Sequence, residues 1–316
     1  MLFRYFSAKY NYEEAYPFDI TQMTDDVSFG RRVPSLHGIS IYTVCELFYQ
    51  FGFYPQFYHR EIYDDELFER LLYVFIESGL PVVAQVPKHA MVLYGHKSDY
   101  TQALDPSDEP VFSDQYMEAL IGTDDNYLPY STFPRDAGGE DLSSEYSISS
   151  VKSFVVPLAE KMHLSAESFL RITEGWLTDE VVGYGALSAG NDAGNLVLRP
   201  FLTGSSSFKE QCRRRNMPAG VKDLYLELPM PRFIWVCELS TPEEYARGNV
   251  LGEVIVDSTS SDRDEFAPIV VHYPHCYILN DRHPTADTGE RLQSERVDEQ
   301  VYSVYDDNLE PVNEGS

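Results

Sequence analysis

His89 is the residue in this chain whose type and setting most suggest a chemical role. It begins the apolar run "HAMVLYGH", which follows the turn and apolar run "SGLPVVAQV". Imidazole titrates near neutral pH, so His89 is a candidate general base. The alternative is a hydrogen-bonded histidine at the start of a buried strand, and the other reactive residues bear on the choice between the two.

Four cysteines supply the candidate thiol nucleophiles and soft metal ligands: Cys45, Cys212, Cys237 and Cys276. They lie far apart in the sequence and form no CxxC pair, which disfavours a structural zinc site. Each lies in an apolar or mixed segment, so we expect reduced thiols. The P-loop, dinucleotide-binding and HExxH signatures are missing from the sequence. We therefore expect neither a metal nor a cofactor.

The charge of the chain limits the partners that it can have. Its 316 residues carry a formal net charge of -27. An acidic surface of this strength repels phosphate backbones, so we expect no binding to nucleic acid, whereas a basic peptide or protein partner is favoured. No apolar run is long enough to span a membrane, and the first residues lack the layout of a signal peptide. We expect a soluble, cytoplasmic protein without membrane association.

A helix must position the residues around Cys45. Apolar residues recur at helical spacing through residues 40–52, which predicts an amphipathic helix. Ser40 is suited to the N-cap of this helix, and Gly52 to its C-terminal stop. Cys45 falls on the apolar stripe, so we expect its thiol to point into the core.

The next elements are expected to carry His89. Residues 64–79 form a second amphipathic pattern that begins at an aspartate N-cap and ends at a glycine. Residues 81–86 and 89–95 are apolar runs of strand length with a tight connection, which predicts an antiparallel hairpin buried on both faces. His96, which follows a glycine at the end of the second strand, is expected to be exposed.

Beyond residue 97 the sequence changes character. A polar stretch holds the turn "GTDDNYLPY" and the loop "RDAGGEDLSSEYSISS", and strand and short helix patterns then alternate as far as residue 280. Helices first, followed by strands with interspersed helices, predict the α+β class. We expect an irregular N-terminal arm, a first region of helices and sheet, a C-terminal α+β region and an acidic, flexible tail, at residues 1–33, 34–150, 151–280 and 281–316.

The order of these elements resembles the papain-like cysteine peptidases, and especially the branch that processes bacteriocins with double-glycine leaders. The resemblance covers about residues 34–135 and is carried by "GISIYTVCELFYQFGF", "SGLPVVAQVPKHAMVLYGH" and "GTDDNYLPY". It implies a core of N-terminal helices packed on an antiparallel sheet, extended here by a second α+β half. It also implies a cysteine at the start of the first helix, a histidine base on a strand, and an Asp or Asn that orients the histidine.

Within this resemblance His89 matches the base, and Asp124 or Asp125 matches the orienting group. The nucleophile differs, because the helix begins with "HGIS" and holds no cysteine in its first turn. Three alternatives follow: a degenerate site that has lost its nucleophile, catalysis by Cys45 in a shifted register, or Ser40 in place of the cysteine. Cys45 lies in the middle of the helix, where the helix dipole does little to lower the pKa of a thiol.

Three functions stay open at this point. The chain is a papain-like protein with a degenerate or atypical site that binds a peptide or protein partner. Alternatively, it is an active cysteine hydrolase that cleaves a peptide or isopeptide bond through Cys45, His89 and one of the two aspartates. In the third alternative it is an acidic interaction protein without a catalytic site, which recruits a basic partner through its charge and its 23 tyrosines.

Overall fold

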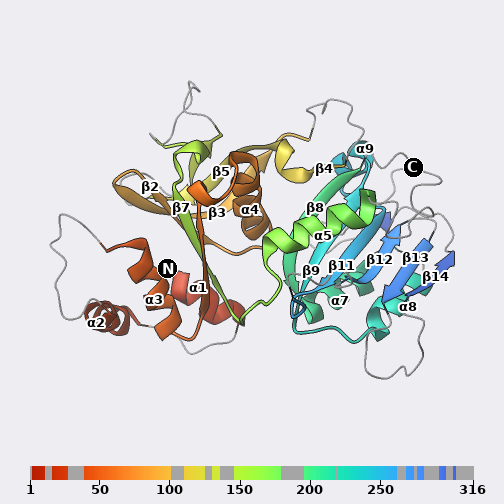
Figure 1. Cartoon of the computed structure of the whole chain (residues 1–316), viewed down its shortest axis with the longest axis horizontal. Helices are drawn as coiled ribbons and strands as arrows, with labels where there is room; N and C mark the ends of the chain where they lie inside the picture. The colour runs from red at the N-terminus through yellow and green to blue at the C-terminus, as the bar shows by residue number, and fades with distance from the viewer. Residues whose placement is uncertain are drawn as a thin grey trace. The chain divides into compact units, whose positions relative to one another are not determined.

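Two compact units make up the computed structural model of this chain (Figure 1). Unit 1 comprises residues 1–98 and 117–162, and unit 2 comprises residues 99–116 and 163–316. Within them the structure describes residues 2–10, 16–27, 39–100, 110–124, 130–135, 146–178, 196–215, 217, 219–261, 268–273, 276–280, 292–296 and 302–303. Both units combine helices with mainly antiparallel sheets, which confirms the predicted α+β class. No helix in these described parts is long and apolar enough to cross a membrane.

A six-stranded antiparallel sheet forms the centre of unit 1, in the order β1-β7-β2-β3-β5-β6. Its strands are β1 (Tyr54–His59), β2 (Val82–Val86), β3 (His89–Ser98), β5 (Met117–Thr123), β6 (Ser131–Pro134) and β7 (Ser153–Leu158). The β2–β3 hairpin is the one that the two apolar runs predict, and Lys88 in its turn has a φ of 67°. β7 is buried along its whole length, so both faces of the sheet are covered there.

Helices cover opposite faces of this sheet. The helices of unit 1 are α1 (Leu2–Tyr10), α2 (Pro17–Val27), α3 (Ile41–Gln50) and α4 (Asp65–Glu77), with the short turns η1 (Arg60–Ile62) and η3 (Ile148–Ser150). Phe75 of α4 packs against Tyr58 of β1, whereas Tyr42 of α3 packs against the neighbouring Phe57. Because successive strand side chains point to opposite faces, α3 and α4 define two faces of the sheet, the α3 face and the α4 face.

Local signals place α3 and α4 where the sequence predicts them. Ser40 and Asp64 are their N-caps, and each side chain accepts a hydrogen bond from the backbone N–H three residues later. Gly52 and Gly79 follow the two helices with φ values of 82° and 63°. A glycine adopts this left-handed conformation without steric cost, which ends each helix cleanly.

The N-terminal segment is not the irregular arm that its weak periodicity suggests. Both α1 and α2 are helical, and α1 buries Phe3 and Phe6 in an aromatic cluster with α3 and the residues that follow it. Lys9 donates a hydrogen bond of 2.6 Å to the carbonyl of Gly79 at the end of α4, and burial lowers the pKa of Lys9 to about 8. The apolar stripe of α1 is short, with Phe3 and Phe6 as its buried aromatic residues, so it gives only a weak helical period in the sequence.

Unit 2 is built on a seven-stranded sheet in the order β14-β13-β12-β11-β9-β8-β4, in which only the β4–β8 pair is parallel among the described strands. Its strands are β4 (Val111–Phe112), β8 (Val197–Gly204), β9 (Phe233–Ser240), β11 (Gly252–Asp257), β12 (Pro268–Tyr273), β13 (Cys276–Asn280) and β14 (Leu292–Arg296), and a separate pair joins β10 (Asn249–Val250) to β15 (Tyr302–Ser303). Its helical segments are α5 (Ala166–Thr178), α7 (Ser205–Arg214), α8 (Ala219–Glu227), α9 (Pro242–Ala246) and the turn η2 (Ser113–Tyr116).

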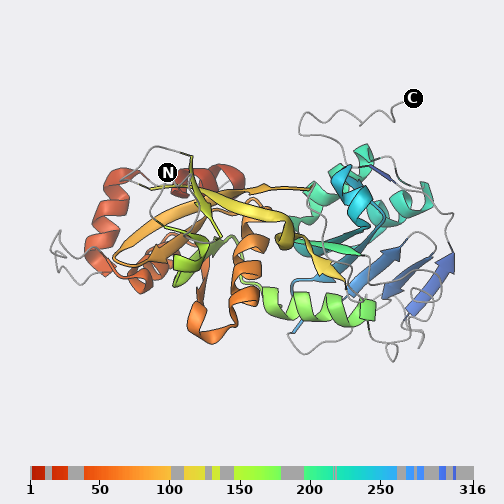
Figure 2. The same ribbon diagram turned by 90° about the horizontal axis from the view of Figure 1, so that it is seen from above.

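Helices enclose this second sheet from both sides. Figure 2 shows the green α5 on one side of the blue strands and the teal helices on the other. Trp235 of β9 stacks on Phe169 of α5, with ring centroids 5.0 Å apart. Its neighbours Ile234 and Val236 point the other way, into a core formed with α7 and α8. Trp235 is therefore a core residue, and β9 is buried along its whole length because helices cover both of its faces.

A row of ionisable side chains, buried except for the partly exposed Arg199, crosses four strands of unit 2 on the α7–α8 side. The row consists of Arg199, Glu238, Glu253 and His272, each directly paired with the next across β8, β9, β11 and β12. Arg215, at the end of α7, donates hydrogen bonds to both glutamates, and Tyr225 of α8 donates one of 2.8 Å to Glu253. Like charges directly opposite each other repel, and the Arg215 guanidinium, which pairs with both carboxylates, offsets this repulsion together with Arg199, which pairs with Glu238.

The boundaries of the units differ from those expected. β7 lies in residues expected to open the C-terminal region, yet it belongs to the sheet of unit 1, between β1 and β2. The expected tail, residues 281–316, contributes β14 and β15, which pair with β13 and β10. Residues 136–145 of the expected loop lie outside the described residues, while Ile148 at its end is fully buried. Pairing between distant segments leaves no local pattern, so the sequence could not reveal it.

Candidate functional site

His89 and Asp124 meet in the sheet of unit 1. His89 Nε2 lies 2.8 Å from Asp124 Oδ1, and the Asp124 side chain is fully buried while the His89 ring is 18% exposed. His89 begins β3, and Asp124 directly follows β5, the neighbouring strand. A buried carboxylate at this distance fixes the orientation of the imidazole. Asp125, the other candidate for this role, lies outside the described residues.

The register of the strands determines the face on which His89 lies. Ala84 of β2 is paired with Phe154 on one side and with Met91 on the other. Directly paired residues share a face, and Phe154 contacts α4 through Phe68 and Phe75. Met91 and His89 are two residues apart on one strand, so both point to the α4 face.

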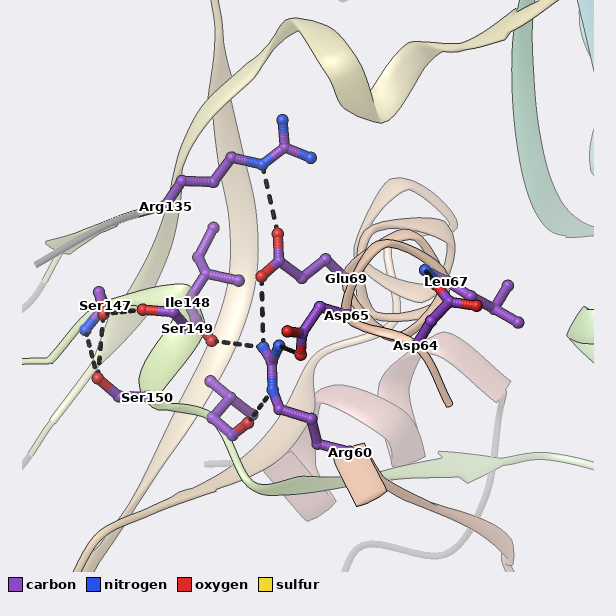
Figure 3. Close-up of polar contacts among 11 residues, drawn as sticks. Arg60, Asp64, Asp65, Leu67, Glu69, Arg135, Ser147, Ile148, Ser149 and Ser150 are labelled. Atoms are coloured by element: carbon purple, nitrogen blue, oxygen red, sulfur yellow. Dashed lines mark hydrogen bonds and ion pairs between the residues drawn. The ribbon is translucent and has the colours of Figure 1, made fainter. Parts of the chain in front are cut away.

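Tyr146 covers the His89 ring, with the two ring centroids 6.0 Å apart and the planes at 18°. Arg60 holds the segment that presents this tyrosine (Figure 3), donating hydrogen bonds of 3.0 Å and 2.8 Å to the carbonyls of Ile148 and Val151. The same guanidinium pairs with Asp65 at 2.5 Å. Asp124 and Tyr146 thus contact the His89 ring, and Arg60 supports the segment that carries Tyr146.

Cys45 lies elsewhere, in a pocket between α3 and the start of β1. The pocket has a volume of about 610 Å³, and its lining includes Tyr42, Cys45, Glu46, Tyr49, Tyr54 and Lys161. Cys45 is half-buried, and this burial raises the pKa of its thiol to about 11. The expectation that Cys45 points into the core is therefore wrong, because its helical position borders an open pocket instead.

The structure does not bring Cys45 to His89. The Cys45 pocket adjoins β1, and His89 begins β3 on the α4 face of the sheet. Two strands, β7 and β2, lie between β1 and β3, so three spacings of about 4.8 Å, or roughly 14 Å, separate them. A base must approach its nucleophile to about 3 Å. Catalysis by Cys45 with His89 as its base has no support in this arrangement.

Ser40 serves as the N-cap of α3, as its sequence position predicts. Its Oγ accepts a hydrogen bond of 3.2 Å from the backbone N–H of Thr43 and lies 3.0 Å from the Thr43 hydroxyl. The first turn of α3 packs on the α3 face through Tyr42, whereas His89 points to the α4 face. Ser40 is thus a capping residue here, and the structure gives it no general base at His89.

A second polar group in unit 1 escaped the sequence reasoning. His96, expected to be exposed, is 16% exposed and lies 2.5 Å from Glu77 Oε2 through Nε2 and 2.9 Å from Ser98 Oγ through Nδ1. His96 and Ser98 are two residues apart on β3, so their side chains point to the same face of the strand. Glu77, the last residue of α4, meets His96 on that face. Tyr73 of α4 contacts the His96 ring, which fixes this group as part of the packing between α4 and β3.

The tyrosine pocket was also missed, although the spacing of its residues signals it. Tyr42 and Tyr49 are seven residues apart on α3, which places them on the same face of the helix, two turns apart. Both side chains are exposed, at 65% and 60%, although aromatic rings are usually covered. Tyr54, at the start of β1, supplies the third ring of the lining.

The part of the chain that the structure describes holds neither a cluster of metal ligands nor, at residues 213–215, an anion-binding patch. No three His, Cys, Asp or Glu side chains gather there as a metal site. The short basic run of residues 213–215 is not a surface patch, because Arg213 and Arg214 pair with Glu210 and Arg215 is buried. Comparison with known proteins gives no relative either: no family model, no curated protein and no solved structure matches this chain.

Proposed function

We propose that this chain is a papain-like protein with a degenerate peptidase site, which binds a peptide or protein partner without cleaving it. The observation that carries the proposal is the separation of the two halves of the expected site. Cys45, the sole cysteine in the sequence of unit 1, lies in the tyrosine pocket, whereas the His89–Asp124 pair points to the α4 face.

The state of the Cys45 thiol argues against cleavage. Catalytic cysteines have a lowered pKa, because the thiolate is the nucleophile. With its pKa raised to about 11, only about one Cys45 thiol in 10,000 is ionised at neutral pH. The position of Cys45 in the second turn of α3 also leaves it outside the turn in which the helix dipole acts.

The shape and chemistry of the tyrosine pocket favour binding. Its volume of about 610 Å³ falls in the range of ligand pockets, roughly 300–1,000 Å³. Tyrosines supply large, rigid contact areas with a polar end, and they are the residues that most often anchor protein interfaces. A side chain of a bound peptide is the ligand that fits such a pocket on an open surface.

Alkylation of Cys45 tests the absence of a catalytic dyad. Iodoacetamide will modify Cys45 slowly at neutral pH, and the rate will rise about tenfold per unit of pH towards the pKa of about 11, because only the thiolate reacts. In His89→Ala the rate will stay within about twofold of wild type. Mass spectrometry of the tryptic peptides gives the rates.

The measurement uses a Cys276→Ser background, and the buried Cys212 and Cys237 serve as internal references of low reactivity. Rapid labelling of Cys45 at neutral pH that disappears in His89→Ala would contradict the proposal. It would favour the active cysteine hydrolase that uses Cys45, His89 and Asp124 or Asp125.

Binding itself is tested with random peptides displayed on phage. Selection on the full chain will enrich peptides whose affinity falls about tenfold or more in Tyr49→Ala, because truncating an aromatic anchor removes most of its contact area. Ile62→Ala, at an exposed position in η1, is the control and will bind as wild type does. A selection that enriches nothing, or enriches peptides indifferent to Tyr49→Ala, would refute binding at the tyrosine pocket.

A further inference from the structure

We infer that the tyrosine pocket recognises a cationic side chain, lysine or arginine, of the bound partner. This inference rests on the proposed function, because it names the chemistry of the ligand for the same pocket. Three exposed tyrosines and one glutamate line the pocket, and this combination distinguishes it from an ordinary apolar hollow.

The order of residues along α3 places the carboxylate between two of the rings. Glu46 is four residues after Tyr42 and three before Tyr49, so all three side chains lie on one face of the helix. The Tyr42 ring is held by Phe57, at a centroid distance of 5.1 Å. Gln50 donates a hydrogen bond of 2.6 Å to Glu46 Oε1, which restrains the carboxylate near the pocket. The cation-binding groups are therefore partly ordered before a ligand arrives.

The chemistry of these groups selects a cation. The face of an aromatic ring carries negative electrostatic potential, so several rings around one point attract an ammonium or guanidinium group. Glu46 adds a formal negative charge beside the rings, and the net charge of -27 attracts basic partners from a distance. An anionic side chain would meet repulsion from Glu46 and from the whole surface.

Lys161 also lines the pocket and opposes this preference. Its ammonium group is of the same sign as the proposed ligand, so it should weaken binding and restrict the approach to the side that Glu46 borders. The Lys161→Gln variant should therefore bind cations more tightly, whereas a pocket that selected anions would lose affinity in the same variant.

Cys45 provides a reporter inside the pocket. In a Cys276→Ser background, Cys45 is labelled with a cationic methanethiosulfonate, the ethyltrimethylammonium reagent, or with the anionic ethylsulfonate reagent. We expect the cationic reagent to react faster, by about fivefold or more relative to a reference site. The reference is Ile62→Cys in a Cys45→Ser background, which reports the general attraction of the acidic chain for cations. Glu46→Gln and Tyr49→Ala should each reduce the excess, and Lys161→Gln should enlarge it.

Protection by small ligands completes the test. N-acetyl-lysine-methylamide should slow the labelling of Cys45, and the neutral isostere N-acetyl-norleucine-methylamide should not. Equal reagent ratios at Cys45 and at the reference site, together with equal protection by the two ligands, would overturn the cation inference. Selected peptides that bind at the pocket through neutral side chains would overturn it too, while the proposed function stood. If instead no peptide binds but the reagent preference holds, the proposed function fails and the cation preference stands.

Discussion

Replacing Arg215 with methionine will destabilise unit 2 by about 3–5 kcal/mol. Methionine fills much of the volume, but it removes the guanidinium that donates to both Glu238 and Glu253. These glutamates are directly paired across β9 and β11, and their side chains are 2% and 0% exposed. Without Arg215, the two buried carboxylates repel each other and lose the positive charge that offsets their removal from water. Both effects raise the free energy of the folded state.

The unfolding of unit 2 can be followed by itself. The chain has two tryptophans, Trp176 and Trp235, and both belong to unit 2. Urea titration with tryptophan fluorescence therefore reports the free energy of unfolding of this unit. Arg214→Met is the matched control, since Arg214 pairs with Glu210 at the surface, and it should cost less than about 0.5 kcal/mol. Equal stability of the Arg215 and Arg214 variants would show that the buried row does not depend on Arg215.

Gly122→Ala will destabilise unit 1 by about 2–3 kcal/mol, although alanine ordinarily suits a strand better than glycine does. A Cβ at this position of β5 would lie 2.6 Å from the carbonyl oxygen of Val92 and 2.8 Å from Leu93 Cδ2. The first contact is with the backbone of β3, which cannot withdraw without weakening the β3–β5 pairing. Urea titration followed by far-ultraviolet circular dichroism gives the change in stability.

The same substitution will disturb the His89–Asp124 contact, because Asp124 lies two residues beyond Gly122. The nitrogen chemical shifts of the His89 ring, which report its tautomer and hydrogen bonds, should change in Gly122→Ala. Gly95→Ala is the control in β3, where a Cβ would meet only the Ile121 side chain, at an ordinary 3.6 Å. A Gly122 variant that matches this control in stability and in His89 shifts would mean that β5 absorbs the methyl without moving.

The parts of the fold that the sequence predicted are those with local causes. Ser40 and Asp64 cap helices through bonds to residues three positions away, and Gly79 ends α4 by its own backbone conformation. The hairpin that begins with β2 follows from two apolar runs and a two-residue turn. The burial of Arg215 has no local cause of this kind, because its partners Glu238 and Glu253 come from strands farther along the chain.

The candidate site likewise has a part that the sequence predicts and a part that depends on tertiary pairing. His89 begins β3, and Asp124 directly follows β5. Both segments are recognisable in the sequence, and the structure brings the two side chains together. The face that His89 occupies depends on the strand register, and a slip of one residue would turn it to the other side. No pattern within α3 reveals that Cys45 and His89 are separated by two strands. The resemblance to papain-like peptidases stays a prediction.

The position of β7, between β1 and β2, has a consequence for how the chain is made. β1 ends at His59 and β7 begins at Ser153, yet β7 lies between β1 and β2 in the finished sheet. The ribosome makes β1 and the β2–β3 hairpin well before β7, the strand that lies between β1 and β2. During that interval both β1 and β2 present backbone edges to the cell, the kind of surface that promotes association between chains. Association between newly made chains is therefore favoured until β7 emerges and pairs with both strands.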